Sequence, residues 1–211
     1  MKIPILYQLE ILLKQKINKL FINKDDFSII SNNCWGTFIY KKFGIAYKSP
    51  FVNLFFFADD YIYLLENFSP EFLKKLSFIK KDESKYKKTL IEYGIYDDNY
   101  PIGILDNKVE VHFLHYTSES DAEDKWHRRL ALINYKRLIF KFSDGDGCRD
   151  EHVEKFDAFD FDRKVCFVSK PFETLKSVIC LDGFTEEGRV RDEWKHFKSK
   201  YNIFKVINEM K

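Results

Sequence analysis

The chain lacks an excess of either charge. Its 35 lysines and arginines nearly balance 33 aspartates and glutamates over 211 residues, so the formal net charge is only +2. Such a balance provides no global attraction to nucleic acid or to an anionic membrane. We therefore expect no nucleic-acid partner, and any anion-binding surface has to be local.

Long apolar runs are lacking too. No stretch reaches the length that a helix needs to cross a bilayer. The apolar start of the chain, residues 1–23, is interrupted by Lys14, Lys16 and Lys19 and is followed by no small-residue cleavage site. This is not the pattern of a secretory signal, so we expect no membrane insertion and a cytoplasmic protein.

Two kinds of cofactor motif are missing. The cysteines show no C-x-x-C spacing, which excludes the usual structural zinc site, and without a secretory context they predict reduced thiols rather than a disulfide framework; they are Cys34, Cys148, Cys166 and Cys180. There is also no glycine-rich phosphate loop of the G-x-G-x-x-G or G-x-x-x-x-G-K type. A phosphorylated ligand would have to be held mostly by side chains.

The chain does contain enough apolar sequence for one core. It is 45% hydrophobic and 32% charged, which is typical of a soluble globular protein, and we expect residues 1–211 to form a single α/β domain. Apolar residues at three- and four-residue spacing predict an amphipathic N-terminal helix at about 3–22.

Strands and helices are predicted to alternate along the rest of the chain. The predicted strands are 27–31, 52–57, 102–105, 109–115, 137–142, 164–168 and 177–181, and the predicted helices are 35–42, 61–65, 70–79, 120–134, 151–159 and one or two after Arg191. Asp106-Asn107 is a hairpin turn between two of these strands. This alternation predicts a three-layer α/β/α fold with a mostly parallel sheet and one antiparallel pair.

The helix at 120–134 carries the strongest local signals. Ser120 and Glu123 have the spacing of a capping box. Trp126, Leu130 and Ile133 line one face, so we expect them to be buried.

Polar residues follow several of the predicted strands. In open α/β sheets, ligands bind beyond the carboxyl ends of the strands, and the residues at those ends are Asn32, Asn33, Cys34, Asp59, Asp60, His115, Tyr116, Asp144, Asp146 and Asp182. We expect Cys34, the Asp59-Asp60 pair, His115 and Asp144 to share one cleft, with Cys34, Asp59, His115 and Asp144 as the catalytic candidates. Turns also favour Asn and Asp for conformational reasons, so solubility and turn chemistry remain the alternative.

The turn after the first strand allows two interpretations. Asn32 and Asn33 precede a predicted helix and could simply cap it, with Gly36 allowing close backbone approach. Alternatively, Cys34 could be a nucleophile if the helix N-terminus and His115 stabilised its thiolate. Buried cysteines are usually inert, so a structural role for Cys34 stays open beside the nucleophilic one.

Two further groups could bind a phosphorylated donor. Lys125, Arg128 and Arg129 share one helix, and guanidinium groups bind two phosphate oxygens at once; the alternative is a solvated basic face. Asp144-Gly145-Asp146 resembles the acid-x-acid element with which glycosyltransferases hold a divalent metal. Mg or Mn with an activated sugar donor would suit Asp144 and Asp146; the alternative is a chance loop sequence.

Five short motifs occur in order along the chain. They are Ser31-Asn32-Asn33-Cys34-Trp35-Gly36, Ser49-Pro50 before Leu54-Phe55-Phe56, Tyr100-Pro101-Ile102-Gly103, Phe113-Leu114-His115-Tyr116 and Lys125-Trp126-His127-Arg128-Arg129. Together they resemble the bacterial family called domain of unknown function 1919, over about 26–171. Thr37 stands where that family favours a second glycine. Members are commonly labelled exopolysaccharide biosynthesis proteins, so the resemblance implies a role in surface-glycan assembly without a settled mechanism.

Three functions are compatible with these residues. The first is a transferase that moves a sugar or acyl group from an activated donor to a glycan acceptor, with His115 as base and the basic helix holding phosphate. The second is a non-catalytic glycan-binding or assembly factor in which Trp35, Tyr116 and Trp126 stack on sugar rings. The third is hydrolysis through Asp59, Asp60 and Asp144, which no motif supports.

Overall fold

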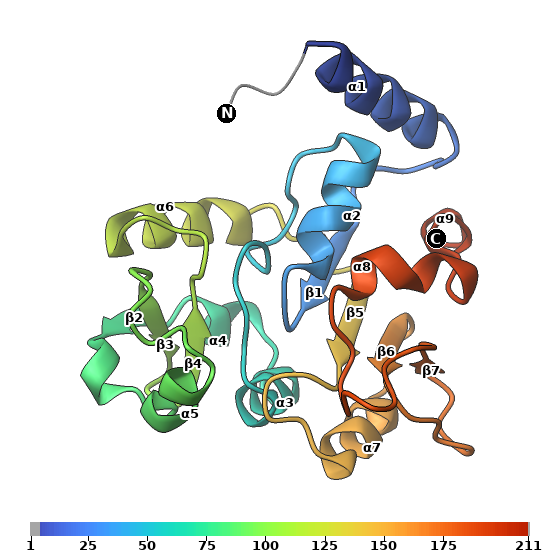
Figure 1. Cartoon of the computed structure of the whole chain (residues 1–211). Coiled ribbons are helices and arrows are strands. Elements are labelled where there is room, and N and C mark those ends of the chain that lie inside the picture. The colour runs from blue at the N-terminus through green and yellow to red at the C-terminus, as the bar shows by residue number, and fades with distance from the viewer. Residues whose placement is uncertain (1–4, 211) are drawn as a thin grey trace.

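The computed structural model describes residues 5–210, and these form two sheets that lie side by side (Figure 1). A four-stranded sheet has the order β1-β5-β6-β7, and a three-stranded sheet has the order β2-β3-β4. The strands are β1 (Ser28–Ser31), β2 (Leu76–Ile79), β3 (Ile102–Leu105), β4 (Val109–His112), β5 (Leu138–Ser143), β6 (Lys164–Val168) and β7 (Val178–Cys180). All pairs in the first sheet are parallel, and those in the second are antiparallel.

Helices cover both faces of the parallel sheet. Those described are α1 (Ile5–Leu20), α2 (Trp35–Phe43), α3 (Ala58–Glu66), α4 (Pro70–Leu73), α5 (Lys87–Glu92), α6 (Glu119–Leu130), α7 (Asp150–Ala158), α8 (Glu193–His196) and α9 (Ile203–Asn208), with 3-10 turns at Lys81–Glu83 and Phe197–Ser199. Ile29 belongs to the core that includes α2 and α9 residues, whereas its neighbour Ile30 belongs to the core that includes α3 and α7 residues. Because successive strand residues point to opposite faces, this sheet is apolar on both sides. The predicted α/β class with a mostly parallel sheet is confirmed.

The antiparallel strands form a sheet of their own, where a pair was predicted. Asp106 and Asn107 make the hairpin turn between Leu105 and Val109 with φ of 51° and 54°, the left-handed conformation that the two central residues of a type I′ turn adopt. The third strand, β2, falls in the region predicted to be helical at 70–79. That helix ends at Leu73, because Leu76–Ile79 pairs with Ile102–Leu105 instead.

The predicted strand at 52–57 is not a strand. Its apolar residues are buried, but they form only one isolated bridge, between Phe55 and His112. The Phe56 N–H donates to the Asn32 carbonyl at 2.9 Å, so the segment lies between β1 and β4 and connects the two sheets. Asn53 has a φ of 60°, which breaks the extended run. A buried connector therefore has the same apolar composition as a central strand.

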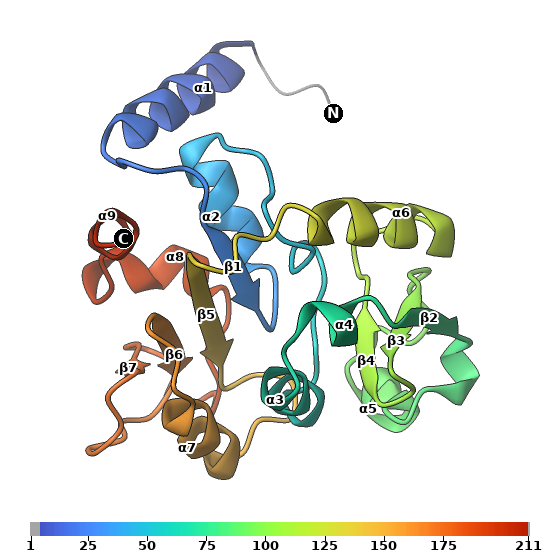
Figure 2. The same cartoon turned by 180° about the vertical axis from the view of Figure 1, so that it is seen from behind.

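Helix α6 lies over one end of the antiparallel sheet (Figure 2). Its N-cap is Ser118, whose hydroxyl accepts from the Asp121 N–H at 3.1 Å, so the predicted capping box at Ser120 and Glu123 is two residues too late. The predicted apolar face is confirmed: Trp126, Leu130 and Ile133 are buried. The Trp126 indole N–H donates to the Leu73 carbonyl at 2.8 Å and fixes α6 against α4.

The chain start and the cysteines follow the sequence patterns. The helix predicted at about 3–22 spans Ile5–Leu20, and its first two predicted residues lie outside the described range. Cys34, Cys148, Cys166 and Cys180 are free thiols.

None of the helices within residues 5–210 combines the length and the apolar character needed to span a bilayer.

Candidate functional site

A cleft of about 830 Å³ opens beyond the carboxyl ends of β1 and β5. One wall comes from the parallel half: Asn33 and Cys34 follow β1, and Ser143 and Asp146 end β5 and its loop. The other wall includes His115 after β4, together with residues after α5. The volume falls within the range of small-molecule sites, and the position is where open α/β sheets bind ligands.

A buried ion pair forms the floor of this cleft. Lys141, in the middle of β5, is fully buried and pairs with the equally buried Glu193 of α8. The Lys141 Nζ also donates to Asn32 Oδ1 at 3.1 Å, to Asn33 Oδ1 at 2.9 Å and to Ser143 Oγ at 3.0 Å. Asn33 Nδ2 donates to Glu193 Oε1 at 2.8 Å. Sequence reasoning missed this network, although a lone lysine inside an apolar strand is a signal that could have indicated it.

The Asn-Asn-Cys-Trp-Gly turn has a structural role and also borders the cleft. The N-cap of α2 is Cys34, and the preceding Asn33 supports the capping interpretation in part, because its side chain accepts from the Trp35 N–H at 3.1 Å. Asn32 and Trp35 are fully buried. A Cβ on Gly36 would lie 3.1 Å from the Ile29 side chain and 3.3 Å from the Phe51 carbonyl, which explains the glycine. Among the first three residues of this turn, Asn33 is the one that reaches both the floor network and the cleft.

Cys34 and His115 lie on the same cleft, as predicted from the strand ends. Burial raises the pKa of the Cys34 thiol to about 11, with Glu193 adding to the effect. The thiol therefore stays protonated near neutral pH, and its sulfur lies 3.8 Å from the Leu54 carbonyl, to which it can donate. This favours the inert reading of Cys34 over the nucleophilic one.

Asp146 is the carboxyl group best placed for proton transfer. It lies in the loop after β5 with a φ of 52°, is half-buried and lines the cleft. Burial is the main cause that raises its pKa to about 6; the nearby Arg189 opposes this shift and Glu193 adds to it. A carboxyl group with this pKa can exchange a proton near neutral pH.

Asp144 is used inside the protein. Its Oδ2 accepts from the Ser169 N–H at 2.6 Å and hydroxyl at 2.7 Å, and its Oδ1 accepts from the Val190 N–H at 2.7 Å. Both oxygens are engaged, so Asp144 positions the segment that carries Arg189 and does not line the cleft. Residues 5–210 contain no group of three or more His, Cys, Asp or Glu placed to hold a metal ion. The geometry therefore gives no support to Asp144 and Asp146 as a metal pair.

The Asp59-Asp60 pair does not reach the cleft. Asp59 is exposed and accepts from Arg149 and from the His152 ring, both at 2.9 Å. Partial burial opposes the ionisation of Asp59, but these hydrogen bonds outweigh it and lower its pKa. Asp60 is buried, binds Lys85, and accepts from the Glu110 N–H at 2.8 Å. Both residues fasten α3 to neighbouring elements, because helical spacing directs them away from the strand ends.

The basic residues of α6 do not form one phosphate-binding face. Arg129 is buried and donates to the Tyr116 hydroxyl at 2.6 Å, whereas Arg128 is exposed on another side of the helix. Lys125 pairs with Asp121 at 2.7 Å. Tyr116 is buried and donates to the Val52 carbonyl at 2.8 Å. Neither these cations nor Tyr116 lines the cleft.

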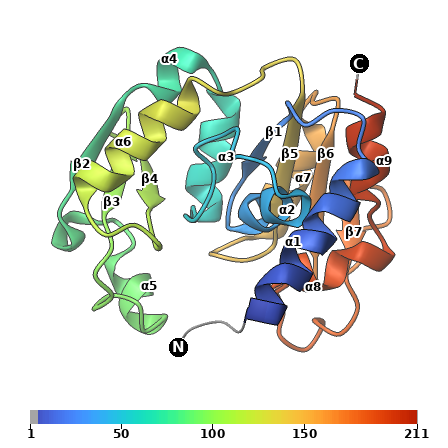
Figure 3. The ribbon, with the colours of Figure 1, turned by 90° about the horizontal axis from the view of Figure 1, so that it is seen from above.

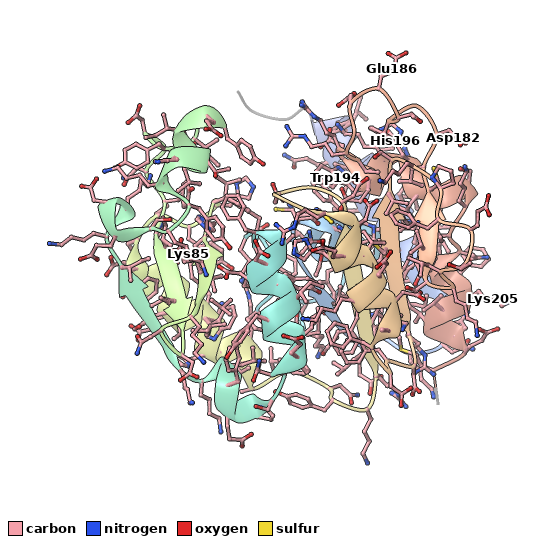
Figure 4. All side chains as sticks on the ribbon, turned by 90° about the horizontal axis from the view of Figure 1, so that it is seen from below. Lys85, Asp182, Glu186, Trp194, His196 and Lys205 are labelled. Carbon is pink, nitrogen blue, oxygen red and sulfur yellow. The ribbon has the colours of Figure 1, made fainter. Side chains whose placement is uncertain are left out.

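An aromatic and cationic wall was missed by sequence reasoning. Trp194 of α8 stacks on Phe38 of α2, with ring centroids 4.2 Å apart and planes 9° apart. Arg189 lies over the Tyr93 ring at 5.4 Å, and Arg191 also lines the cleft. Figure 4 shows Trp194 on the parallel-sheet half and Lys85 on the antiparallel half. The only sequence signal was a tryptophan in a charged segment with no strand directly before it.

Comparison with known proteins gives the family of the chain. The family model described as "Domain of unknown function (DUF1919)" matches residues 6–211, so the chain belongs to this family. The chain is also similar to an uncharacterized protein of Haemophilus influenzae, with 30% identity over 191 residues that cover 85% of each chain. The resemblance carried by the ordered motifs is thereby confirmed, and the match extends to both sides of them.

Proposed function

We propose that this member of the DUF1919 family is a transferase of bacterial surface-polysaccharide or glycan biosynthesis that moves a glycosyl or acyl group from an activated donor to a sugar hydroxyl. The observation that carries the proposal is the composition of the cleft: a stacked aromatic pair, two guanidinium groups and the carboxyl group of Asp146 line one volume. Free thiols suit a reducing compartment, so a cytoplasmic location is part of the proposal.

The acceptor sugar is assigned to the aromatic wall. Trp194 is half-buried and Phe38 is 36% exposed, so both rings are open to a ligand. Aromatic faces beside polar groups suit the apolar face and the hydroxyls of a sugar. These two residues replace the predicted stacking residues Trp35, Tyr116 and Trp126, whose burial keeps them from a ligand.

The activated donor is assigned to Arg189 and Arg191. A nucleotide sugar carries a diphosphate and coenzyme A carries phosphates, and guanidinium groups bind such oxygens in pairs. Arg191 already pairs with Glu187 at 3.0 Å, and Arg189 is half-buried beside Tyr93. These arginines take the role predicted for Lys125, Arg128 and Arg129, which lie outside the cleft.

Asp146 is the proposed general base, with His115 as the other candidate. Transfer requires that the acceptor hydroxyl lose its proton while its oxygen bonds to the transferred carbon and the donor's leaving group departs. The carboxylate of Asp146 could take that proton, since its pKa is about 6. His115 is exposed on the opposite wall and could do the same.

The experiment begins with a thermal-shift screen of nucleotide sugars, acyl-CoA and free sugars, with and without Mg or Mn. A ligand that binds only the folded state raises the melting temperature. The best donor is then incubated with sugar acceptors, and the products are identified by mass spectrometry. We expect Asp146→Asn to lower turnover by roughly 100-fold or more while donor binding persists. Asp59→Asn, outside the cleft, is the matched control; equal losses in both variants would contradict the assignment.

A non-catalytic glycan-binding factor is the alternative, and the Phe38–Trp194 stack favours it equally. Binding a sugar requires no change of protonation, so Asp146 and the arginines would have no catalytic task. This function predicts that free glycans stabilise the protein, that no activated donor does, and that no product forms. That set of results would replace the transferase proposal.

A further inference from the structure

Helix α1 packs against the body through its polar side. Gln15 donates to the Lys41 carbonyl at 2.8 Å, and Asn18 donates to the Lys42 carbonyl at 3.1 Å, so α1 rests on the C-terminal end of α2. Figure 3 shows α1 on the outside of α2, away from the antiparallel sheet. Gln15 and Asn18 are one turn apart and are half-buried. The opposite side of the helix therefore faces outward.

That outward side is apolar. Residues at three- and four-residue spacing share a helix face. In α1 most of the positions on this face are leucines. The exposed fractions are 81% for Leu6, 56% for Leu9, 52% for Leu12, 59% for Leu13, 45% for Ile17 and 83% for Leu20. A contiguous apolar face of this kind that is exposed to solvent marks an interaction site.

The charges on α1 favour a lipid surface as the occupant. The helix contains Lys14, Lys16 and Lys19 against the single acid Glu10, which pairs with Lys14; Lys19 pairs with Asp25 just after the helix. Lys16 projects from within the leucine face. Against the same face of a second copy, this ammonium group would be buried opposite apolar side chains at a high cost. At a bilayer, its long stem can lie along the acyl chains while the ammonium reaches the lipid phosphates.

We propose that α1 binds the surface of an anionic phospholipid bilayer, lying in the plane of the interface with its leucine face among the acyl chains. The polar contacts of Gln15 and Asn18 hold the helix on α2 and leave that face free. The proposal is independent of the reaction in the cleft, because none of the residues lining the cleft belongs to α1.

Vesicle flotation tests this directly with the full chain. Wild-type protein is mixed with vesicles of phosphatidylglycerol or of phosphatidylcholine at constant salt. We expect binding to phosphatidylglycerol to be roughly 10-fold or more stronger, because each basic residue near an anionic surface adds to the attraction. Leu9→Glu/Leu13→Glu should weaken binding by more than about 10-fold, since the bilayer then loses two leucine side chains that would lie among its acyl chains. The matched control is Ile91→Glu, an exposed apolar residue of α5, which should bind as wild type does.

A second variant removes the charge and keeps the apolar face. Lys14→Gln/Lys16→Gln/Lys19→Gln should lose the preference for phosphatidylglycerol and most of the salt dependence. Thermal melts check that all variants remain folded. Absence of wild-type binding to either vesicle would overturn the proposal. So would self-association in sedimentation velocity that Leu9→Glu/Leu13→Glu abolishes without any vesicle binding, because the face would then belong to a second copy.

Discussion

The two halves of the molecule both bury charge, but they bury it in different surroundings. In the parallel half, Lys141 and Glu193 are both fully enclosed at the floor of the cleft. Where α3 meets the antiparallel half, Asp60 is buried while its partner Lys85 keeps 46% of its side chain exposed. Figure 4 labels Lys85 on the half opposite Trp194.

The two ion pairs therefore have different roles: one supports the candidate ligand site, and the other joins two packed elements. The Lys141–Glu193 pair holds Asn33 and Ser143, and both of these line the cleft. Asp60 instead accepts from the Glu110 backbone and so fastens α3 to β4. A fully buried ion pair within a parallel sheet can therefore pre-organise a ligand site, whereas the half-exposed pair between α3 and the loop before α5 only stabilises packing.

The largest effect is expected at Lys141. Lys141→Met leaves the Glu193 carboxylate buried without its partner, which should cost about 3 to 5 kcal/mol of unfolding free energy. Urea denaturation measures it. The double variant Lys141→Met/Glu193→Leu removes both charges and should recover most of the loss. A single-variant loss below about 1 kcal/mol would mean that the pair is hydrated and does not form a rigid floor.

A smaller effect is expected at Asp60. Asp60→Ala removes the acceptor of the buried Glu110 N–H and should cost about 1 to 3 kcal/mol. The neighbouring Asp59→Ala is the control, because Asp59 forms an exposed ion pair with Arg149 and should cost less than about 1 kcal/mol. Equal losses in urea melts would contradict the distinction between a buried fastening and a surface pair.

The third predicted effect, at Asp146, stabilises the protein and depends on pH. The folded pKa of Asp146, about 6, lies above its ordinary value of 3.8, so its contribution is full below about pH 4 and is lost as pH rises through 6. Asp146→Asn should thus stabilise the protein by about 1 to 3 kcal/mol at pH 8 and by nothing at pH 4. Urea melts at both pH values measure this. Asp144→Asn, which weakens three accepted hydrogen bonds, should destabilise at pH 8; an Asp146→Asn effect that does not depend on pH would contradict the account.

The sequence predicts the strands of the parallel sheet well, because each is a short apolar run. It does not predict that the antiparallel strands form a second sheet, distinct from the parallel one. The connector at 52–57 is as apolar as a strand, and β2 follows a well-capped helical turn that begins at Pro70. Whether such segments pair depends on partners distant in sequence, which local patterns do not specify.

The sequence predicts those residues of the candidate site that follow strands, and it does not predict those that lie elsewhere. Strand ends identified Cys34, His115 and Asp146, since topology brings such ends together. Arg189 and Trp194 follow no strand directly; the segment before α8 is held by the contact between Asp144 and Val190. The basic residues of α6 were misleading, because charge density in a helix does not tell which side faces a cleft.

One calorimetric titration tests the central claim, that the ligand site is the cleft and not the basic helix. The best ligand from the screen is titrated into wild type, Trp194→Ala, Arg189→Lys and the α6 control Arg128→Lys at constant salt. Loss of the stacking ring should weaken binding by roughly 10-fold, and Arg189→Lys should weaken a phosphorylated donor because the paired hydrogen bonds are lost. Arg128→Lys should bind as wild type does. Weakened binding in Arg128→Lys with unchanged binding in both cleft variants would contradict the account.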